Sequence, residues 1–172
     1  MVGMMGSGKT AVGKFLATLI DVPFVDSDDE IVAAANMSIA EIFERDGEAF
    51  FRSRETEVIE RLLTAQPCII SAGGGLFLSE RNRDLIKGQG VSLWLKADLN
   101  LLWSRVRHKN TRPLLRTPNP RATLKELLSN RTPFYEMADI CVETKPAFSI
   151  EATAKMAQKA LIERHDIVEV AQ

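Results

Sequence analysis

The chain has 172 residues, 45% of them hydrophobic and 26% charged, which suits one domain with a buried core and excludes intrinsic disorder. With 22 Lys and Arg against 23 Asp and Glu, its net charge of -1 argues against a surface devoted to nucleic acid or anionic membrane. No apolar run approaches the ~18 residues that cross a bilayer, and the glycine-rich residues 3–10 do not form a secretory signal. We therefore expect a cytoplasmic protein without nucleic-acid or membrane partners, folded as a single domain of residues 1–172.

Short apolar runs alternate with longer amphipathic stretches along the chain. The first half predicts, in order, a helix at residues 9–20, a strand at 24–26, a helix at 28–35, a capping box at 38–41, a helix at 48–65 and a strand at 68–71. The second half predicts a helix at 79–87, a strand at 91–95, a helix at 98–106, a proline-rich loop at 108–120, a helix at 122–130, a strand at 140–142 and a helix at 149–164. This alternation predicts an α/β fold, with a parallel β-sheet flanked by helices on both faces.

Residues 3–10, Gly-Met-Met-Gly-Ser-Gly-Lys-Thr, fit the phosphate-binding pattern G-x-x-x-x-G-K-[ST] at every fixed position. The glycines let backbone amides turn toward a β-phosphate, and the helix that follows points its positive end at the same anion. Lys9 can bridge the β- and γ-phosphates, and the Thr10 hydroxyl can bind Mg²⁺. The pattern predicts a purine nucleoside triphosphate with magnesium. Because only Met1 and Val2 precede it, either the first strand is clipped or the true start lies upstream.

The second substrate must be inferred from residues outside this pattern. Asp26 and Asp28 follow the predicted strand at 24–26, where one carboxylate can hold Mg²⁺ through water and the other can accept a proton from an acceptor hydroxyl. Arg52 suits a carboxylate, although an ordinary surface ion pair with Glu55 is the alternative. The glycines at 73–75 can present bare backbone to a ligand or form a flexible turn. Asp28, in turn, can simply cap the next helix.

Basic residues are concentrated between Arg105 and Arg131. This segment contains eight Lys and Arg and one acid, so its charge is +7 and the rest of the chain carries -8, the two summing to the net -1. No aromatic residue lies between Arg105 and Arg131 to stack on bases, which weakens an RNA-binding interpretation. A lid at about residues 108–121 that closes over a triphosphate fits better.

Several isolated residues receive structural interpretations. Cys68 and Cys141 lie in apolar stretches and are predicted to be buried free thiols, because a disulfide scaffold needs more cysteines. Trp94 and Trp103 are predicted to be core residues rather than binding platforms.

Together these features resemble the shikimate kinase family, a group of small P-loop enzymes with the nucleoside-monophosphate-kinase fold. The resemblance extends from Gly3 to about Ala160. Its marks, in chain order, are residues 3–10, 26–28, Phe51 and Arg52 with Glu55, residues 71–75, residues 112–115, and Arg131 with Tyr135, Ala138 and Asp139. The resemblance implies transfer of the ATP γ-phosphate to the 3-hydroxyl of shikimate, a step in chorismate and aromatic amino-acid biosynthesis.

The family pattern also implies roles for single residues. Lys9, Asp28 and Arg112 would be catalytic, with Asp28 as the candidate base, and Thr10 and Asp26 would hold Mg²⁺. Shikimate would contact Asp28, Arg52, Gly73, Gly74, Gly75 and Arg131, within acceptor-binding helices at about 28–60 and their surroundings. ATP would contact Gly6, Ser7, Gly8, Lys9, Thr10, Ala11, Arg105, Arg112 and Pro146. Ala11 stands where the family often has Ser or Thr, so one possible phosphate contact is lost.

Two other functions remain open at this stage. A related kinase acting on gluconate or a nucleotide would share the ATP site but needs a different acceptor pocket. A non-catalytic nucleotide-binding or RNA-associated module should have lost Asp28 or Arg112, and this chain has both. We therefore expect ATP and shikimate as the partners of a monomer.

Overall fold

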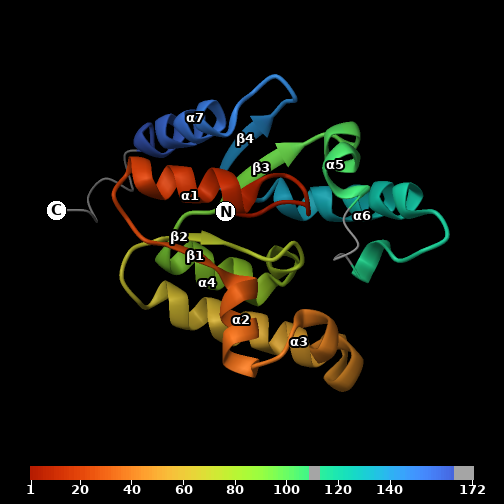
Figure 1. The fold of residues 1–172 in the computed structure, drawn as a ribbon. Helices are drawn as coiled ribbons and strands as arrows, with labels where there is room; N and C mark the ends of the chain where they lie inside the picture. Colours follow the sequence, from red (N-terminus) through yellow and green to blue (C-terminus); the bar gives the residue numbers. More distant parts are fainter. Residues whose placement is uncertain (109–112, 165–172) are drawn as a thin grey trace.

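All paired strands in the computed structural model run parallel, and the model describes residues 1–108 and 113–164. The strands are β1 (Phe24–Asp26), β2 (Ile69–Ser71), β3 (Leu93–Ala97) and β4 (Ile140–Thr144). The helices are α1 (Lys9–Leu19), α2 (Ser27–Ala35), α3 (Ile39–Leu63), α4 (Glu80–Gln89), α5 (Leu99–Val106), α6 (Pro120–Tyr135) and α7 (Ile150–Ile162). Two short 3₁₀ turns, η1 (Leu76–Leu78) and η2 (Pro113–Leu115), complete the arrangement in Figure 1.

Met1 and Val2 join the two pairs of strands into one sheet. The Met1 amino group donates to the carbonyl of Ile70, and the Met1 carbonyl accepts from Ala72 N–H at 2.9 Å. On the other side, Val2 N–H donates to Leu93 at 2.8 Å and the Val2 carbonyl accepts from Leu95 N–H at 3.0 Å. The spatial order is therefore β1, β2, Met1–Val2, β3, β4, and the predicted parallel α/β fold is confirmed.

Each face of this sheet has its own hydrophobic cluster. On one face, Leu93 and Leu95 of β3 pack with Val12 and Leu16 of α1 and with Ala154 of α7. On the other face, the alternate residue Trp94 packs among residues of α4, α5 and α6. This alternation along β3 follows from the two-residue period of a strand. Figure 1 shows α1 and α7 together on the left of the view and α5 and α6 together on the right.

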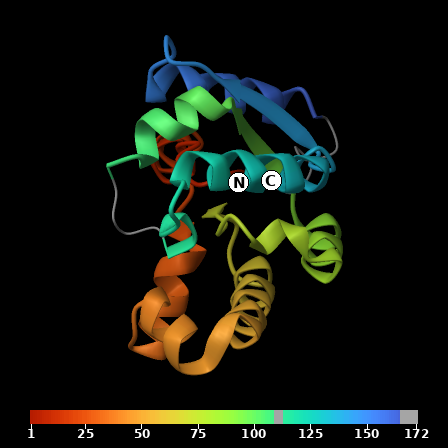
Figure 2. The ribbon, with the colours of Figure 1, turned by 90° about the vertical axis from the view of Figure 1, so that its right-hand side faces the viewer.

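Helices α2 and α3 extend away from the sheet and enclose a third, smaller cluster. Its buried members are Ile31, Ile42, Phe51 and Val58. The predicted capping box is confirmed, because Ser38 Oγ accepts from Glu41 N–H and Glu41 Oε2 accepts from Ser38 N–H. Gly47, with φ 80° and ψ 173°, kinks α3, so the helix predicted from residue 48 continues from one that begins at residue 39. Figure 2 shows this helical arm at the bottom of the molecule.

Some predicted element boundaries were wrong. The strand expected at 91–95 lies at Leu93–Ala97, because the Ser92 N–H and hydroxyl both donate to Asp139 at 2.9 and 2.6 Å. The helix expected at 122–130 spans Pro120–Tyr135. Asn119 caps it by accepting from Ala122 N–H, and Pro133 is tolerated in its last turns, where few backbone bonds are lost.

The expected burial of the two thiols was also wrong. Cys141 is exposed because buried and exposed residues alternate along β4, and it is on the exposed side. Cys68 is only half-buried and lies just before β2 begins at Ile69. The core assignment holds for Trp94, which is buried, and Trp103 packs partly buried against the same cluster.

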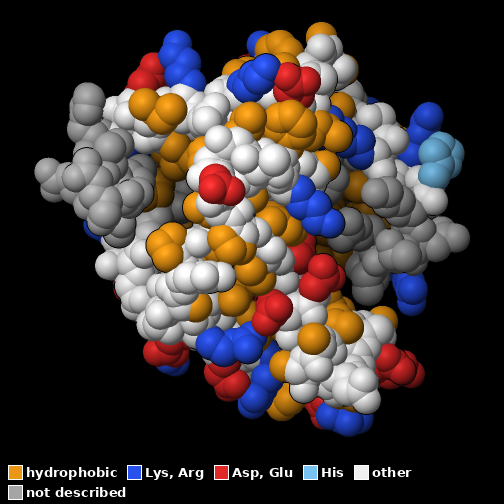
Figure 3. Space-filling model, turned by 60° about the vertical axis from the view of Figure 1, so that its left-hand side comes forward, with side chains coloured by type: hydrophobic (Ala, Val, Ile, Leu, Met, Phe, Trp, Pro, Cys, Tyr) orange, Lys and Arg blue, Asp and Glu red, His pale blue; other side chains and the backbone are white. Residues whose placement is uncertain are grey.

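The surface mixes charges of both signs. On the face in Figure 3, acidic and basic side chains alternate, with hydrophobic side chains between them. Within residues 1–108 and 113–164, no helix combines the length and the apolar character that a membrane span requires. The structure thus adds no evidence for a membrane-spanning helix among the described residues.

Two glycines with equal space but different backbone angles provide a stability test. A Cβ atom would meet nothing within 4 Å at Gly47 or at Gly88, yet only Gly47 has a positive φ, 80°. We expect Gly88→Ala to stabilise the protein by about 0.5–1 kcal/mol, because alanine loses less backbone entropy in helix α4. Gly47→Ala should destabilise it by about 1–3 kcal/mol through backbone strain.

Thermal unfolding measures both variants. With ~2–4 °C per kcal/mol for a domain of this size, Tm should rise slightly for Gly88→Ala and fall by several degrees for Gly47→Ala. Equal shifts for the two variants would contradict the backbone argument.

Candidate active site

The phosphate-binding loop runs from Val2 into α1, through backbone that glycine adopts easily. Gly3, Gly6 and Gly8 have φ of 137°, 82° and 101°, values at which residues with a side chain are strained. The side chain of Lys9 folds back over this loop, donating to the carbonyls of Gly3 at 2.9 Å and Met4 at 3.1 Å. The loop therefore surrounds an ammonium group next to backbone amides at a helix N-terminus, an arrangement that binds phosphates.

Thr10 and Asp26 lie together beside this loop. The Thr10 hydroxyl donates to Asp26 Oδ2 at 3.1 Å, while Asp26 Oδ1 accepts from Asp28 N–H at 3.1 Å and caps α2. The capping role considered for Asp28 therefore belongs to Asp26, and Asp28 lies in the first turn of α2. A hydroxyl and a carboxylate side by side are hard oxygen donors of the kind Mg²⁺ prefers.

Arg105 of α5 contacts the same loop from the opposite side. Its Nη1 donates to the carbonyls of Gly6 at 3.1 Å and Ser7 at 3.0 Å. A Cβ at Gly6 would lie 2.7 Å from Val106, so α5 packs closely on the loop. Arg105 is thus beside the predicted ATP-binding residues Gly6, Ser7 and Gly8.

The glycines at 73–75 lie at the centre of a ring of charged side chains. A Cβ at Gly73 would lie 2.6 Å from Asp28 Oδ1 and 2.8 Å from Glu55 Oε1. At Gly75 a Cβ would overlap the Arg52 guanidinium, and at Gly74 it would lie 3.2 Å from Arg131 Nη1. The absence of side chains therefore lets these charged groups from α2, α3 and α6 meet at one loop.

This glycine loop also packs against the phosphate-binding loop. A Cβ at Gly74 would lie 3.7 Å from the Gly3 carbonyl oxygen and 3.8 Å from the Met5 nitrogen. Gly73 N–H donates to the buried Ser27 hydroxyl at 3.0 Å, which fixes the loop to the start of α2. The two halves of the predicted site, for donor and for acceptor, are therefore adjacent.

Arg52 is held by two carboxylates of its own helix. Its Nη1 pairs with Glu55 Oε2 at 2.5 Å and its Nη2 with Glu48 Oε1 at 3.0 Å. Although burial lowers the pKa of Arg52, the two carboxylates raise it more, so the group stays cationic. The ion pair with Glu55 named in the alternative is present, but it is not an ordinary surface pair, because the Glu55 side chain is 1% exposed.

Glu55 is the most unusual acid of the site. Its Oε1 is buried and accepts no hydrogen bond from the described residues. Burial raises the pKa of Glu55, Arg52 lowers it, and the neighbouring Asp28 raises it again, with a net upward shift. The sequence showed Glu55 only as a neighbour of Arg52, and Glu48, four residues before Arg52, was overlooked although this spacing favours an ion pair.

Three predicted site residues are outside this group. Arg112 and its neighbours at 109–111, which belong to the lid predicted at about 108–121, fall outside the described residues. Ala11 is exposed in the first turn of α1, and Pro146 is exposed in the turn after β4.

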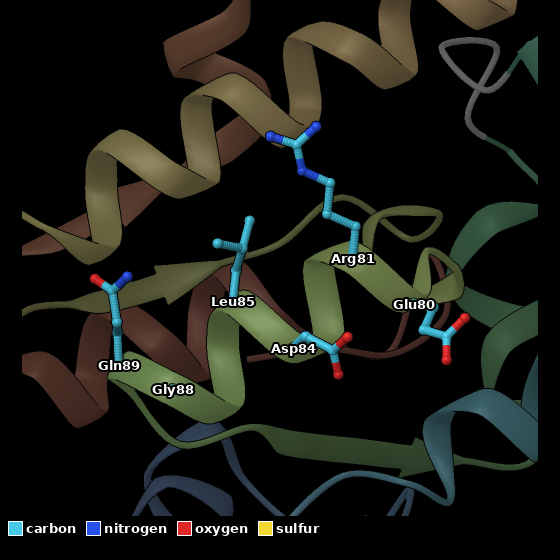
Figure 4. A pocket seen from close by; sticks show the side chains of 6 residues that line it. All are labelled: Glu80, Arg81, Asp84, Leu85, Gly88 and Gln89. Atoms are coloured by element: carbon cyan, nitrogen blue, oxygen red, sulfur yellow. The ribbon is translucent and has the colours of Figure 1, made fainter.

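A pocket of about 540 Å³ lies elsewhere, along helix α4. Figure 4 shows that its lining comes from this one helix, with Arg81 pointing toward α3 and Asp84 away from it. It contains none of the predicted site residues, so the adjacent loops, rather than this hollow, define the candidate site. Its lining residues are Glu80, Arg81, Asp84, Leu85, Gly88 and Gln89.

Comparison with known proteins gives a consistent result. The sequence profile of the family described as Shikimate kinase matches residues 5–162. A shikimate kinase of Ruegeria pomeroyi is 61% identical over 170 residues, covering 99% of this chain and 87% of that protein. One of Cereibacter sphaeroides is 59% identical over 169 residues, covering 98% and 84%. Among solved structures, shikimate kinase from Acinetobacter baumannii in complex with shikimate has a TM-score of 0.85 and 36% identity, covering 99% of this chain and 93% of that one.

The raised pKa of Glu55 predicts a pH dependence of stability. Between its ordinary value of 4.5 and its raised pKa, the folded state binds more protons at this carboxyl than the unfolded state does. The free energy of unfolding should therefore fall as the pH rises through this window. Glu55→Gln removes this titration, so its stability should change less with pH than that of the wild type.

Thermal unfolding between about pH 4 and pH 8 measures the difference. Glu57→Gln, a change to an exposed carboxylate of the same helix, is the matched control and should follow the wild-type profile. Parallel profiles for wild type and Glu55→Gln would contradict the raised pKa.

Proposed function

The chain belongs to the shikimate kinase family, and we propose that its two adjacent loops carry out the family reaction, transfer of the ATP γ-phosphate to the 3-hydroxyl of shikimate. The observation that carries this proposal is the contact of Gly74 with the phosphate-binding loop at Gly3 and Met5. An in-line phosphoryl transfer requires donor and acceptor to be held side by side. The arginine-containing pocket around the glycine loop and the phosphate-binding loop are in direct contact, so they meet this requirement.

On the donor side, we assign ATP to the loop and its surroundings. Backbone amides at Gly6, Ser7 and Gly8 would hold the β-phosphate, and Lys9 would leave the Gly3 and Met4 carbonyls to contact the β- and γ-phosphates. Ala11, Arg105 and Pro146 complete the proposed ATP contacts. Arg105, which lies on the loop carbonyls, would support the adenine from the α5 side.

The Thr10–Asp26 pair fits a magnesium ion. Within the described residues no group of three or more His, Cys, Asp or Glu side chains could hold a metal, which suits an ion held largely by phosphate oxygens and water. Thr10 would bind Mg²⁺ directly and Asp26 through water. The bound ion would neutralise charge on the transferring phosphoryl group.

On the acceptor side, we assign shikimate to the ring around the glycine loop. Arg52 and Arg131 would bind its carboxylate as a charged fork, and the backbone at Gly73, Gly74 and Gly75 would contact its hydroxyls. Asp28 would orient the reacting hydroxyl and receive its proton. Arg112 would bring a further positive charge to the phosphates when the lid closes.

The proposal also covers oligomeric state, localisation and partners: we propose a monomeric cytoplasmic enzyme of one domain. It would bind two small anions and neither nucleic acid nor membrane. On the face in Figure 3, charges of both signs are mixed, without the continuous positive patch that is typical of a nucleic-acid-binding surface.

Release of ADP in a coupled assay tests the function. Shikimate should support turnover with Mg²⁺ present, whereas gluconate and nucleoside monophosphates should not, because neither pairs a carboxylate with ring hydroxyls as the pocket requires. A higher rate with gluconate or a nucleotide would assign the chain to a different acceptor. ADP release without any acceptor would argue for a simple ATPase.

Arg52→Ala tests the acceptor pocket separately. Loss of a charged hydrogen bond of about 2 kcal/mol should raise the KM for shikimate ~30-fold while leaving the KM for ATP within twofold. Arg54→Ala, a change to a partly exposed arginine of the same helix that pairs with Glu57, is the control and should change neither value. An equal rise in both KM values for Arg52→Ala would contradict the assignment.

A further inference from the structure

Tyr135 lies in the active site, and its hydroxyl has no role in the reaction described so far. The side chain is 1% exposed and comes from the end of α6, one helical turn after Arg131. Its ring stacks on Trp94, with centroids 6.0 Å apart and planes 29° apart. Burial raises the pKa of the Tyr135 hydroxyl, and Arg131 lowers it, with a net upward shift that keeps the group protonated as a donor.

The Tyr135 hydroxyl and Arg131 donate to the same acceptor. Tyr135 Oη lies 2.5 Å from the Gly74 carbonyl oxygen, and Arg131 Nη1 lies 3.2 Å from it. A carbonyl oxygen has two lone pairs, so both donors can bind at once. The Gly74 carbonyl is therefore fixed from the α6 side by two side chains.

Fixing this carbonyl also fixes the amide beyond it. In a planar trans peptide the C=O and the following N–H point in opposite directions, and the described residues have no cis peptide. The Gly75 N–H must therefore point away from α6. Within the described part of the chain, neither Gly74 N–H nor Gly75 N–H donates a backbone hydrogen bond, so these amides are available to a ligand.

Arg131 cannot serve the carbonyl and the acceptor equally well. A bidentate grip on a carboxylate uses N–H groups on two guanidinium nitrogens in one plane, and Nη1 is already directed at Gly74. When Arg131 binds the acceptor's carboxylate, its contact with Gly74 weakens. Tyr135 then remains as the donor that keeps the carbonyl satisfied.

We propose that Tyr135 is a positioning residue: its hydroxyl holds the Gly74 peptide so that Arg131 is released to the acceptor and the Gly75 amide stays directed at it. This inference rests on the proposed function, because it takes the acceptor to be a carboxylate with hydroxyls. It assigns to Tyr135 no contact with the substrate and no proton transfer.

Tyr135→Phe removes the hydroxyl and keeps the ring. We expect the KM and Kd for shikimate to rise about tenfold, because Arg131 must then either stay at Gly74 or leave that carbonyl unsatisfied. The KM for ATP should stay within twofold. Steady-state kinetics and calorimetric titration with shikimate and with ATP measure these values.

The same hydroxyl also lies 3.8 Å from the Met4 sulfur in the phosphate-binding loop. If Tyr135 acted only by supporting this loop, Tyr135→Phe would raise the KM for ATP as much as that for shikimate, and this result would overturn the proposal. Phe134→Leu, a change to the exposed neighbour of Tyr135 in α6, is the control and should leave the KM for shikimate unchanged. A tenfold rise for Phe134→Leu would likewise overturn the proposal.

A double variant tests the coupling to Arg131. In an Arg131→Ala background, Tyr135→Phe should raise the Kd for shikimate by much less than tenfold, because no arginine remains to be released. The same fold-change in both backgrounds would contradict the proposal, as would a shikimate KM for Tyr135→Phe within twofold of the wild type. Turnover of shikimate by the wild type is measured in the same assay. If the wild type does not phosphorylate shikimate, the proposed function is wrong; if it does, the result for Tyr135→Phe tests only the role of Tyr135.

Discussion

Close approach of backbone to charged side chains at residues 73–75 is the constraint on which the active site depends. Any side chain at Gly73 would displace Asp28 and Glu55, and any at Gly75 would displace Arg52. Glycine has the additional cost of a more flexible unfolded chain. In return, charged side chains from α2, α3 and α6 can all lie against the backbone of this one loop. The same loop also contacts the phosphate-binding loop.

The parallel sheet explains why these loops meet. The phosphate-binding loop follows Val2, and the glycine loop follows β2, which is the neighbour of Met1 in the sheet. Carboxyl ends of adjacent parallel strands lie at one edge, where ligands bind in open α/β sheets. Asp26 ends β1, the next strand along, so strand order brings the proposed Mg²⁺ ligands, the phosphate-binding loop and the proposed acceptor loop to the same edge of the sheet.

Much of this arrangement could be predicted from the sequence, since the phosphate-binding pattern has fixed spacing and strands alternate with amphipathic helices. The family resemblance indicated Arg52, Arg131 and the glycines as a group. Contacts between distant segments could not be predicted, because they depend on packing: Tyr135 and Gly74 are 61 positions apart. Burial of Glu55 was missed for the same reason, and the helix predicted at 122–130 continues to Tyr135 because the last turns of a helix tolerate a proline such as Pro133.

The separate small cluster inside α2 and α3 has an evolutionary consequence. Ile31, Ile42, Phe51 and Val58 pack with each other and not with the clusters on the two faces of the sheet. Substitutions at these four positions can therefore accumulate with little effect on the phosphate-binding loop. Repacking of this arm can shift the proposed acceptor residues Asp28 and Arg52 while the phosphate-binding loop stays unchanged, so divergence of substrate choice within the fold can begin in one part of the chain.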